Sequence, residues 1–220
     1  RITIDNTAPD IMVIAGKPVM KIGEKLYSTK TVNFTVVAKD ALSGIESTQY
    51  TINGRDYSDY VAPFNIINDG EIELKTKSID RVSNLSEMFS LKVINDADGK
   101  EIELRETSVK LFIDNIAPKV SVAPDKELVT KDSKAIASVD YKYAVTAEDG
   151  ESGVASILVR VDGKGDFMAY KEPIAFTTNG DHLIEAKAVD KMGNMSNSTI
   201  LSVFVDIIPP QSIIETVTEK

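Results

Sequence analysis

Apolar and polar residues alternate along short stretches of this chain, and the same alternation occurs twice. Apolar residues occupy every second position of residues 32–36, and the same phase returns in residues 141–145. Alternation over such short runs predicts β-strands with one buried face. No comparable stretch has the 3.6-residue period of a long amphipathic helix. Three further pairs of runs keep a common phase: 48–52 with 157–161, 74–76 with 184–186, and 111–113 with 203–205.

Turn signals separate these runs. Asn53-Gly54 and Asp162-Gly163 are typical of two-residue hairpin turns, because these residue types tolerate a positive φ. Pro63 and Pro173 indicate an edge or a crossover, since proline cannot donate a hydrogen bond to a β-ladder. About seven short strands in each half, spaced by turns, predict an antiparallel β-sandwich. A closed β-barrel is the alternative architecture.

Three short motifs occur in the same order in both halves of the chain. The repeat distance is 109 residues at the first two motifs (114 − 5 and 149 − 40) and 110 at the third (190 − 80). The halves are therefore two copies of one module, and the first motif returns in part at residues 206–210. The motifs are Asp-Asn-x-Ala-Pro at 5–9 and 114–118, Asp-x-x-Ser-Gly at 40–44 and 149–153, and Asp-x-x-x-Asn at 80–84 and 190–194.

The repeat predicts two tandem domains, at residues 1–113 and 114–206. Residues 207–220 are then a tail or the start of a following repeat, in a piece of a longer protein. The first copy has about 18 extra residues before its exit (34 − 16, counted from the third motif to the next copy). They contain Asp98-Gly99 between β-prone runs, which predicts an inserted β-hairpin near residues 92–108 that extends the last two strands of the first copy. A loose loop is the alternative.

The order of these motifs resembles that of bacterial Ig-like repeats, and the resemblance covers almost the whole chain apart from the insert. It implies two tandem Ig-like antiparallel β-sandwich domains of a bacterial surface or secreted protein. The first copy departs from the pattern at Ser83, where the second copy has Gly193. The Asp-Asn-x-Ala-Pro motif is also similar to the calcium-binding linker of cadherins, over that short stretch alone.

Composition narrows the range of functions. The net charge is −9 and the pI about 4.8, so we expect no nucleic-acid partner. No apolar run is long enough to cross a bilayer as a helix, so we expect no membrane insertion of this segment. The hydrophobic share of 42% suffices for globular cores, and cysteine is absent.

The chain offers little catalytic chemistry. It has one histidine, His182, at the start of a predicted strand, and no nucleophile elbow, phosphate loop or dinucleotide fingerprint. Asp149 and Glu151 form a carboxylate pair, but no pocket of unusual residues accompanies them. We therefore expect a protein that is not an enzyme and has no cofactor apart from a possible calcium ion.

The acidic turn residues are the candidate site. In a β-sandwich, the loops after the second strand and before the last strand lie at the pole where the chain enters. Oxygen ligands from several loops are what calcium needs, whereas capping of the turns by Asp, Asn and Ser is the alternative role. The best predicted set lies where the two copies join, and consists of Asp114, Asn115, Asp149, Glu151, Asp190 and Asn194. The weaker equivalent set in the first copy consists of Asp5, Asn6, Asp40, Asp80 and Asn84, near Ser43.

Together, these expectations predict that the chain is a non-catalytic structural or adhesive module. It would form part of an extended stalk outside the cell or on its surface. The alternative is an accessory spacer or glycan-binding segment of a secreted glycan-active enzyme. The predicted partners are neighbouring Ig-like repeats and an extracellular protein or glycan, which would contact the insert. Six aromatic residues form either a glycan-stacking strip or, more in keeping with their repeated positions, packing contacts: Tyr57, Tyr60, Phe64, Phe167, Tyr170 and Phe176.

Overall fold

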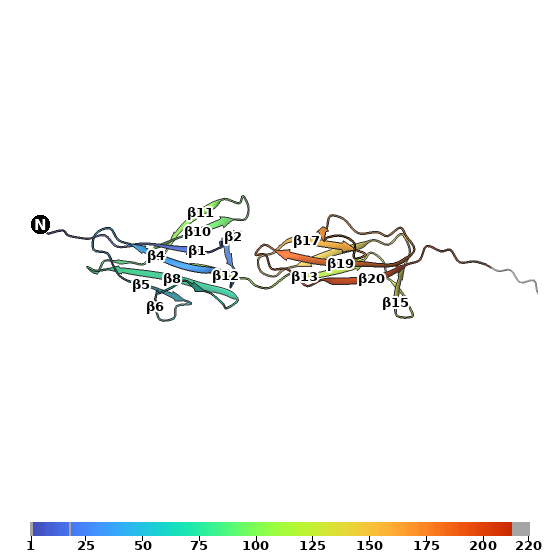
Figure 1. Ribbon diagram of the computed structural model, residues 1–220, viewed down its shortest axis with the longest axis horizontal. Helices are drawn as coiled ribbons and strands as arrows, with labels where there is room; N and C mark the ends of the chain where they lie inside the picture. Colours follow the sequence, from blue (N-terminus) through green and yellow to red (C-terminus); the bar gives the residue numbers. More distant parts are fainter. Residues whose placement is uncertain (1, 18, 213–220) are drawn as a thin grey trace, which may run out of the picture. The chain divides into compact units, whose positions relative to one another are not determined.

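The computed structural model describes residues 2–17 and 19–212, and the regular elements of these residues are all β-strands. The predicted all-β class is therefore confirmed. The chain divides into two compact units, of which the first ends at Ile116 and the second begins at Ala117 (Figure 1). No helix among the described residues has the length and apolar character needed to cross a membrane. Of the predicted tail at 207–220, residues 213–220 lie outside the described part.

The described residues of the first unit form one sheet of twelve strands, of which ten follow a continuous path while β9 and β11 pair with β8 and β10 beside it. They are β1 (Asp10–Ala15), β2 (Val19–Ile22), β3 (Lys25–Ser28), β4 (Asn33–Lys39), β5 (Ile45–Ile52), β6 (Ser58–Asp59), β7 (Phe64–Asn65), β8 (Gly70–Asp80), β9 (Leu85–Ser86), β10 (Phe89–Asn95), β11 (Glu101–Glu106) and β12 (Val109–Ile113).

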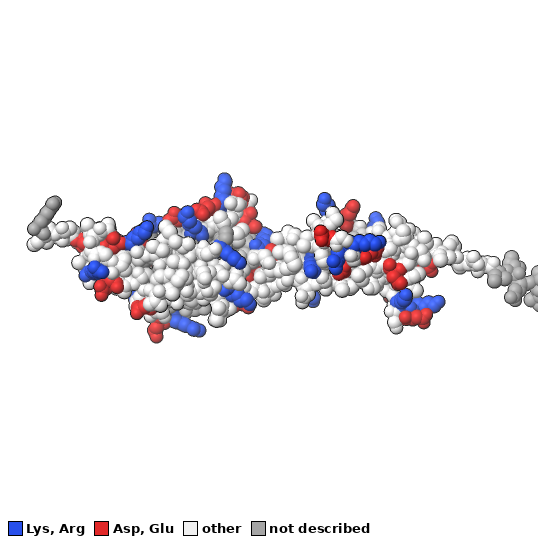
Figure 2. All heavy atoms as spheres, in the orientation of Figure 1, with Lys and Arg blue, Asp and Glu red and all other residues white. Residues whose placement is uncertain are grey.

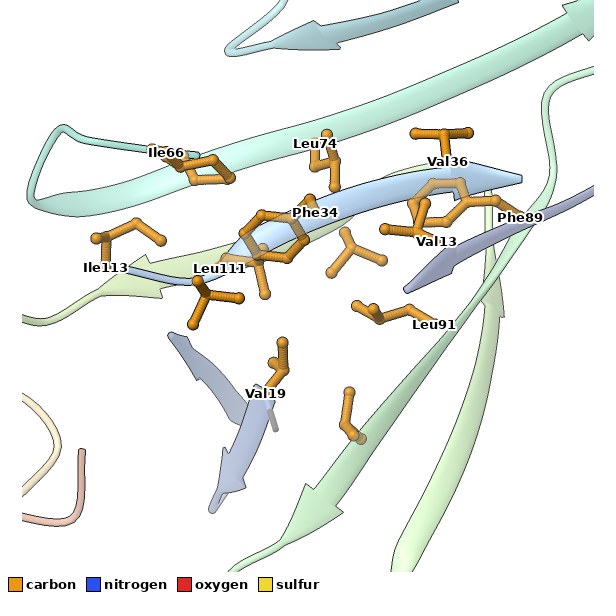
Figure 3. Close-up of a cluster of buried hydrophobic side chains, with 14 of the residues drawn as sticks. Val13, Val19, Phe34, Val36, Ile66, Leu74, Phe89, Leu91, Leu111 and Ile113 are labelled. Carbon is orange, nitrogen blue, oxygen red and sulfur yellow. The ribbon is translucent and has the colours of Figure 1, made fainter. Parts of the chain in front are cut away.

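The path folds into two facing layers. One layer has the order β7-β4-β1-β10-β11, and the other has the order β6-β5-β8-β12-β3. Strand β2 joins them, because it pairs antiparallel with β3 and parallel with β10. The buried side chains of both layers form one hydrophobic cluster, which includes Val13, Phe34, Leu74 and Leu111 (Figure 3). Period-2 alternation therefore places one face of each layer in a common core.

The extra residues of the first copy form a β-hairpin that belongs to this core. Strands β10 and β11 pair antiparallel, and β10 also runs parallel to β1, with Ile11 opposite Phe89 and Val13 opposite Leu91. Phe89 and Leu91 have relative exposures of 0% and 1%, and they lie in the same cluster as Phe34 (Figure 3). The outward side of the hairpin is charged, with Lys92 in an ion pair to Glu101. The hairpin therefore serves as a wall of the first unit. The prediction that it extends the last two strands was wrong, because β10 pairs with the distant strand β1 and lies in the opposite layer from β8 and β12.

The described residues of the second unit form eight strands in two separate sheets, β13-β16 and β14-β15-β20-β19-β17-β18. They are β13 (Lys119–Pro124), β14 (Val129–Lys131), β15 (Lys134–Ala137), β16 (Tyr143–Glu148), β17 (Val154–Val161), β18 (Met168–Ala169), β19 (Gly180–Asp190) and β20 (Thr199–Val205).

Between β19 and β20, the described part of the second unit has no counterpart of the hairpin, and its buried residues divide into two clusters. One cluster contains Tyr143, Phe176 and Ile184, and the other contains Val120 and Ala186. A single bridge between Tyr143 and Ile174 takes the place of the β4–β7 pairing in the first unit. The sheet that contains β13 is therefore much smaller than the equivalent layer of the first unit.

The turns have the backbone that their residue types suggest. Asn53 and Gly54 have φ values of 57° and 64°, and Asp162 and Gly163 have 54° and 62°, as in a type I′ hairpin turn. The turn at the third motif also needs a positive φ, which is 88° at Gly193. Ser83 adopts 73° at the equivalent place, so the first unit makes the same turn with a non-glycine residue.

Candidate metal centre

The loop after β4 is organised by the carboxylate of Asp40. Its Oδ1 atom accepts hydrogen bonds from the backbone N–H groups of Leu42 at 3.1 Å and Gly44 at 2.7 Å, and from the Ser43 hydroxyl at 3.3 Å. Gly44 has a φ of 77°, which only glycine adopts without strain. One oxygen of Asp40 therefore caps the whole Asp-x-x-Ser-Gly turn, as expected for an aspartate at the start of a turn.

Asp80 ends β8 and organises the next loop in the same way. Its Oδ1 atom accepts from the N–H groups of Val82 at 3.0 Å and Asn84 at 2.8 Å. Its Oδ2 atom accepts from Nδ2 of Asn84 at 2.7 Å. Asp80 is almost completely buried, with 1% relative exposure. The loop therefore encloses this carboxylate and satisfies both of its oxygens.

The N-terminal segment brings a third carboxylate to the two loops. Asp5 accepts from the N–H of Thr7 at 3.0 Å through Oδ1 and from the N–H of Ser43 at 2.9 Å through Oδ2. The side-chain amide of Asn84 donates to the backbone carbonyl of Asp5 at 3.2 Å. Asn6, which the sequence also suggested, is exposed and has no side-chain hydrogen bond within the described chain. The segment is thus tied to both loops through Asp5.

The three carboxylates converge. One oxygen from each of Asp5, Asp40 and Asp80 lies within 4.8 Å of the other two. The Oδ2 atom of Asp40 is buried and accepts no hydrogen bond within residues 2–17 and 19–212. In that same part of the chain, no lysine or arginine forms an ion pair with any of the three. Hard oxygen donors of this kind fit a calcium ion, and a buried carboxylate oxygen without a donor would gain most from one.

The surroundings favour the ionised form of two of these carboxylates, Asp5 and Asp80. Hydrogen bonds from Ser43, led by its side chain, and from the Thr7 N–H lower the pKa of Asp5, although burial and the charge on Asp80 act against this. Burial opposes the ionisation of Asp80, but hydrogen bonds from Asn84, from the Ser43 side chain and from the Val82 N–H together outweigh it and lower the pKa of Asp80. Hydrogen bonds from the loops therefore hold the negative charges of Asp5 and Asp80 close together.

Acid should weaken the first unit through this cluster. Because the pKa of Asp80 in the folded state lies below its ordinary value of 3.8, its contribution to stability is complete above about pH 4 and is lost as the pH falls through the folded-state pKa. We expect Asp80→Asn to lower the melting temperature at about pH 6 and to lower it less at about pH 2. Melting curves at both values test this. The exposed Asp56, changed to Asn, is the control, and a deficit for Asp80→Asn that is equal at both values would contradict the prediction.

The second copy repeats the turn geometry. Oδ1 of Asp149 accepts from the N–H groups of Glu151 at 3.2 Å and Gly153 at 2.7 Å. Oδ1 of Asp190 accepts from the N–H groups of Met192 and Asn194, both at 2.8 Å, and its Oδ2 accepts from Nδ2 of Asn194 at 2.7 Å. Glu151 is exposed. These loops therefore present the same carboxylates in the same way as the loops of the first unit.

Asp114 and Asn115 belong to the first unit. Oδ1 of Asp114 accepts from the N–H of Ile116 at 3.0 Å. Asn115 connects two loops of that unit, because its Oδ1 accepts from the N–H of Lys30 at 3.0 Å and its amide donates to Asp69. The other four residues of the best predicted set lie in the second unit, so the six-residue set as a whole stays a prediction.

The other candidate residues have packing roles. His182 lies against the ring of Phe176, with ring centroids 4.1 Å apart, and its Nδ1 is 3.2 Å from Asp162. Tyr60 and Phe64 both contact the ring of Tyr50, with centroids 6.5 Å and 4.0 Å away. Charged side chains of both signs are interspersed on the face shown in Figure 2, without a patch of one sign. The sequence did not point to Thr7, although a residue two positions after an aspartate is a usual partner in an Asx turn.

The chain has distant likenesses to known structures. No family model matches the chain, and no curated protein matches it. Among solved structures, the chain is similar to fibronectin(III)-like modules of Clostridium thermocellum CbhA, with 19% identity, a TM-score of 0.38, and coverage of 92% of this chain and 100% of the other. It is also similar to the D00-D0 domain of intimin, with 11% identity, a TM-score of 0.30, and coverage of 89% and 100%.

A third similar structure is the extracellular domain of a putative hybrid two-component system from B. thetaiotaomicron. It has 12% identity and a TM-score of 0.31, and the match covers 84% of this chain and 35% of the other. At these TM-scores and identities, none of the three likenesses carries an argument about function. The functional interpretation therefore rests on the residues of this chain.

Proposed function

We propose that this chain is a non-catalytic structural module of a bacterial surface or secreted protein, and that a calcium ion strengthens its first unit. The observation that carries the calcium site is the Oδ2 atom of Asp40. This atom is buried and accepts no hydrogen bond within the described residues, and it belongs to a cluster of three carboxylates from three separate segments. The tandem repeat supports the structural role, because repeated modules are typical of arrays and not of single catalytic sites.

A cation held at this cluster would connect three parts of the first unit. Asp5 belongs to the N-terminal segment, Asp40 to the loop after β4, and Asp80 to the end of β8. The ion would supply positive charge among carboxylates that otherwise repel one another, as the effect of Asp80 on Asp5 indicates. Water and backbone carbonyls would complete the coordination, because calcium takes six to eight oxygen ligands.

The proposal extends to the second copy by sequence equivalence. Asp114, Asp149 and Asp190 occupy the positions of Asp5, Asp40 and Asp80 in the repeat. We propose that they form the corresponding calcium site, with Asn115, Glu151 and Asn194 as further oxygen donors. The partners of such a module would be neighbouring repeats of the same protein and an extracellular protein or glycan.

Melting temperatures in calcium and in chelator test the calcium site. A ligand that binds only the folded state must stabilise it, and a calcium concentration tenfold above the dissociation constant should raise the melting temperature of the first unit by roughly 5 °C. Asp40→Asn should abolish this rise, because the amide keeps an oxygen that caps the turn but replaces the second carboxylate oxygen. The matched control is Asp56→Asn, at an exposed aspartate, which should leave the rise unchanged. Equal melting temperatures in calcium and chelator would contradict the proposal.

A further inference from the structure

The two units differ in the number of neighbours that one strand has in its sheet. In the first unit, β1 has β4 on one side and the parallel strand β10 on the other. In the second unit, β13 is the equivalent strand, since Val120 and Val122 occupy the positions of Ile11 and Val13 in the repeat. Strand β13 pairs with β16 alone among the described strands. Its outer edge is therefore open where the first unit carries the strand of its insert.

The apolar side chains of this strand are more completely buried in the first unit than in the second. Ile11 and Val13 have relative exposures of 0% and 1%, whereas Val120 has 9% and Val122 is partly buried. In the first unit, apolar side chains at alternate positions of β10 fill the adjacent part of the core, and these are Phe89, Leu91 and Val93. The second unit has no segment at the position of β10 in the repeat. Val120 and Val122 are therefore covered less completely than Ile11 and Val13, their counterparts in the first unit.

The backbone of β13 has hydrogen-bonding groups on this open side. The hydroxyl of Thr199 donates to the carbonyl of Val120 at 3.1 Å, and Thr199 is in β20, outside the β13–β16 ladder. The Val120 carbonyl therefore points away from β16. Because alternate residues of a strand direct their N–H and C=O groups to the same side, Val122 presents its groups to the open edge as well. Thr199 caps one of these groups, and an added strand would pair with the others.

The charged residue at the start of the strand differs between the open edge of β13 and the equivalent edge of β1. In the first unit, Arg105 of β11 reaches Asp10 of β1, with 3.3 Å between the charged groups. The position of Asp10 is taken by Lys119 in the second unit. Lys119 is exposed and, although the ladder places it opposite Glu148, it forms no ion pair within the described chain. A segment that pairs with β13 should therefore carry a carboxylate where the insert of the first unit carries a positive charge.

We propose that the open edge of β13 accepts an extended segment of a partner polypeptide, as a strand parallel to β13. The segment has apolar residues at alternate positions, as Phe89 and Leu91 have in β10, and an acidic residue that faces Lys119. Backbone hydrogen bonds supply much of the affinity in such a pairing, and the side chains at alternate positions supply the specificity.

Two peptides based on residues 88–95 test this with the whole chain. In the register of β1 and β10, Met88 would lie beside Lys119. A Met88→Glu peptide should slow hydrogen exchange at the amides of Val120 and Val122, as followed by NMR. This peptide should bind about two- to fivefold more tightly than a Met88→Lys peptide, because opposite charges directly across paired strands stabilise the pairing and like charges destabilise it. Lys119→Glu in the protein should reverse the order of the two affinities. Ile11 and Val13, whose edge is filled, should keep their exchange rates.

A second variant tests the edge independently of charge. Thr199→Ala frees the carbonyl of Val120 and should tighten binding of the Met88→Glu peptide by roughly two- to tenfold, the factor that corresponds to one hydrogen bond. The proposal is overturned if about 1 mM of this peptide fails to protect Val120 and Val122, or if protection appears at Ile11 and Val13 instead. It is also overturned if the amides of these two valines become protected from hydrogen exchange without peptide as the chain dimerises. The segment that pairs with β13 would then come from a second copy of the chain.

Discussion

Replacement of Phe89 by alanine should lower the free energy of unfolding of the first unit by about 3–5 kcal/mol. Phe89 is fully buried, at 0% exposure, in the cluster that both layers of this unit share. The loss combines the transfer of a large ring to water with the cavity that remains between the two layers. Such a loss is comparable to the whole stability of a typical small domain, so the variant should leave the first unit largely unfolded near its normal melting temperature.

The neighbouring residue provides the matched control. Met88 is 46% exposed and precedes the same strand, so Met88→Ala should change the stability by less than about 0.5 kcal/mol. Urea unfolding, followed through the amide NMR signals of each unit, measures both variants. A loss below about 1 kcal/mol for Phe89→Ala would mean that the hairpin is an appendage and not a wall of the core.

Removal of one hydroxyl group should stabilise the second unit. Tyr143 is 1% exposed, and its hydroxyl is buried without a hydrogen-bond partner among the described residues. The same burial raises the pKa of this tyrosine. Because a buried polar group without a partner costs about 1–3 kcal/mol, Tyr143→Phe should raise the free energy of unfolding by about that amount.

The repeat provides the reciprocal change. Phe34 occupies the position of Tyr143 in the first unit and is fully buried against Phe64, with ring centroids 5.9 Å apart. Phe34→Tyr should therefore destabilise the first unit by about 1–3 kcal/mol. Urea unfolding of each variant, unit by unit, gives both values. If Tyr143→Phe destabilises the second unit instead, its hydroxyl has a favourable interaction in solution.

Much of the local structure follows from local sequence. The strands fall where apolar residues alternate, because a side chain faces the core at every second position of a strand. Asn53-Gly54 and Asp162-Gly163 form the expected hairpin turns, since their residue types accept a positive φ. The aspartates at 40 and 80 cap their own loops, which depends only on backbone N–H groups within the next four residues.

The candidate site shows where local sequence stops being sufficient. The motifs pointed to Asp5, Asp40 and Asp80, and the structure brings them within 4.8 Å of one another. The motifs gave no indication that one oxygen of Asp40 would be buried without a donor while Asp80 has both oxygens satisfied. That difference depends on how three distant segments are placed, and the spacing of residues within each motif says nothing about it.

The sequence by itself determined the all-β class, the repeat, the turns and the acidic positions, because each depends on residues that are close together in the chain. The tertiary structure decided that the insert completes the core of the first unit. It also decided that the second unit, which has no such insert, has an open edge at β13. Strand β10 pairs with β1, which lies far away in the sequence, and its apolar side chains therefore complete the first core. Strand β13 has no such neighbour among the described residues, so its edge stays open. Pairing between distant strands is set by the burial of the whole core and not by the residues of one strand.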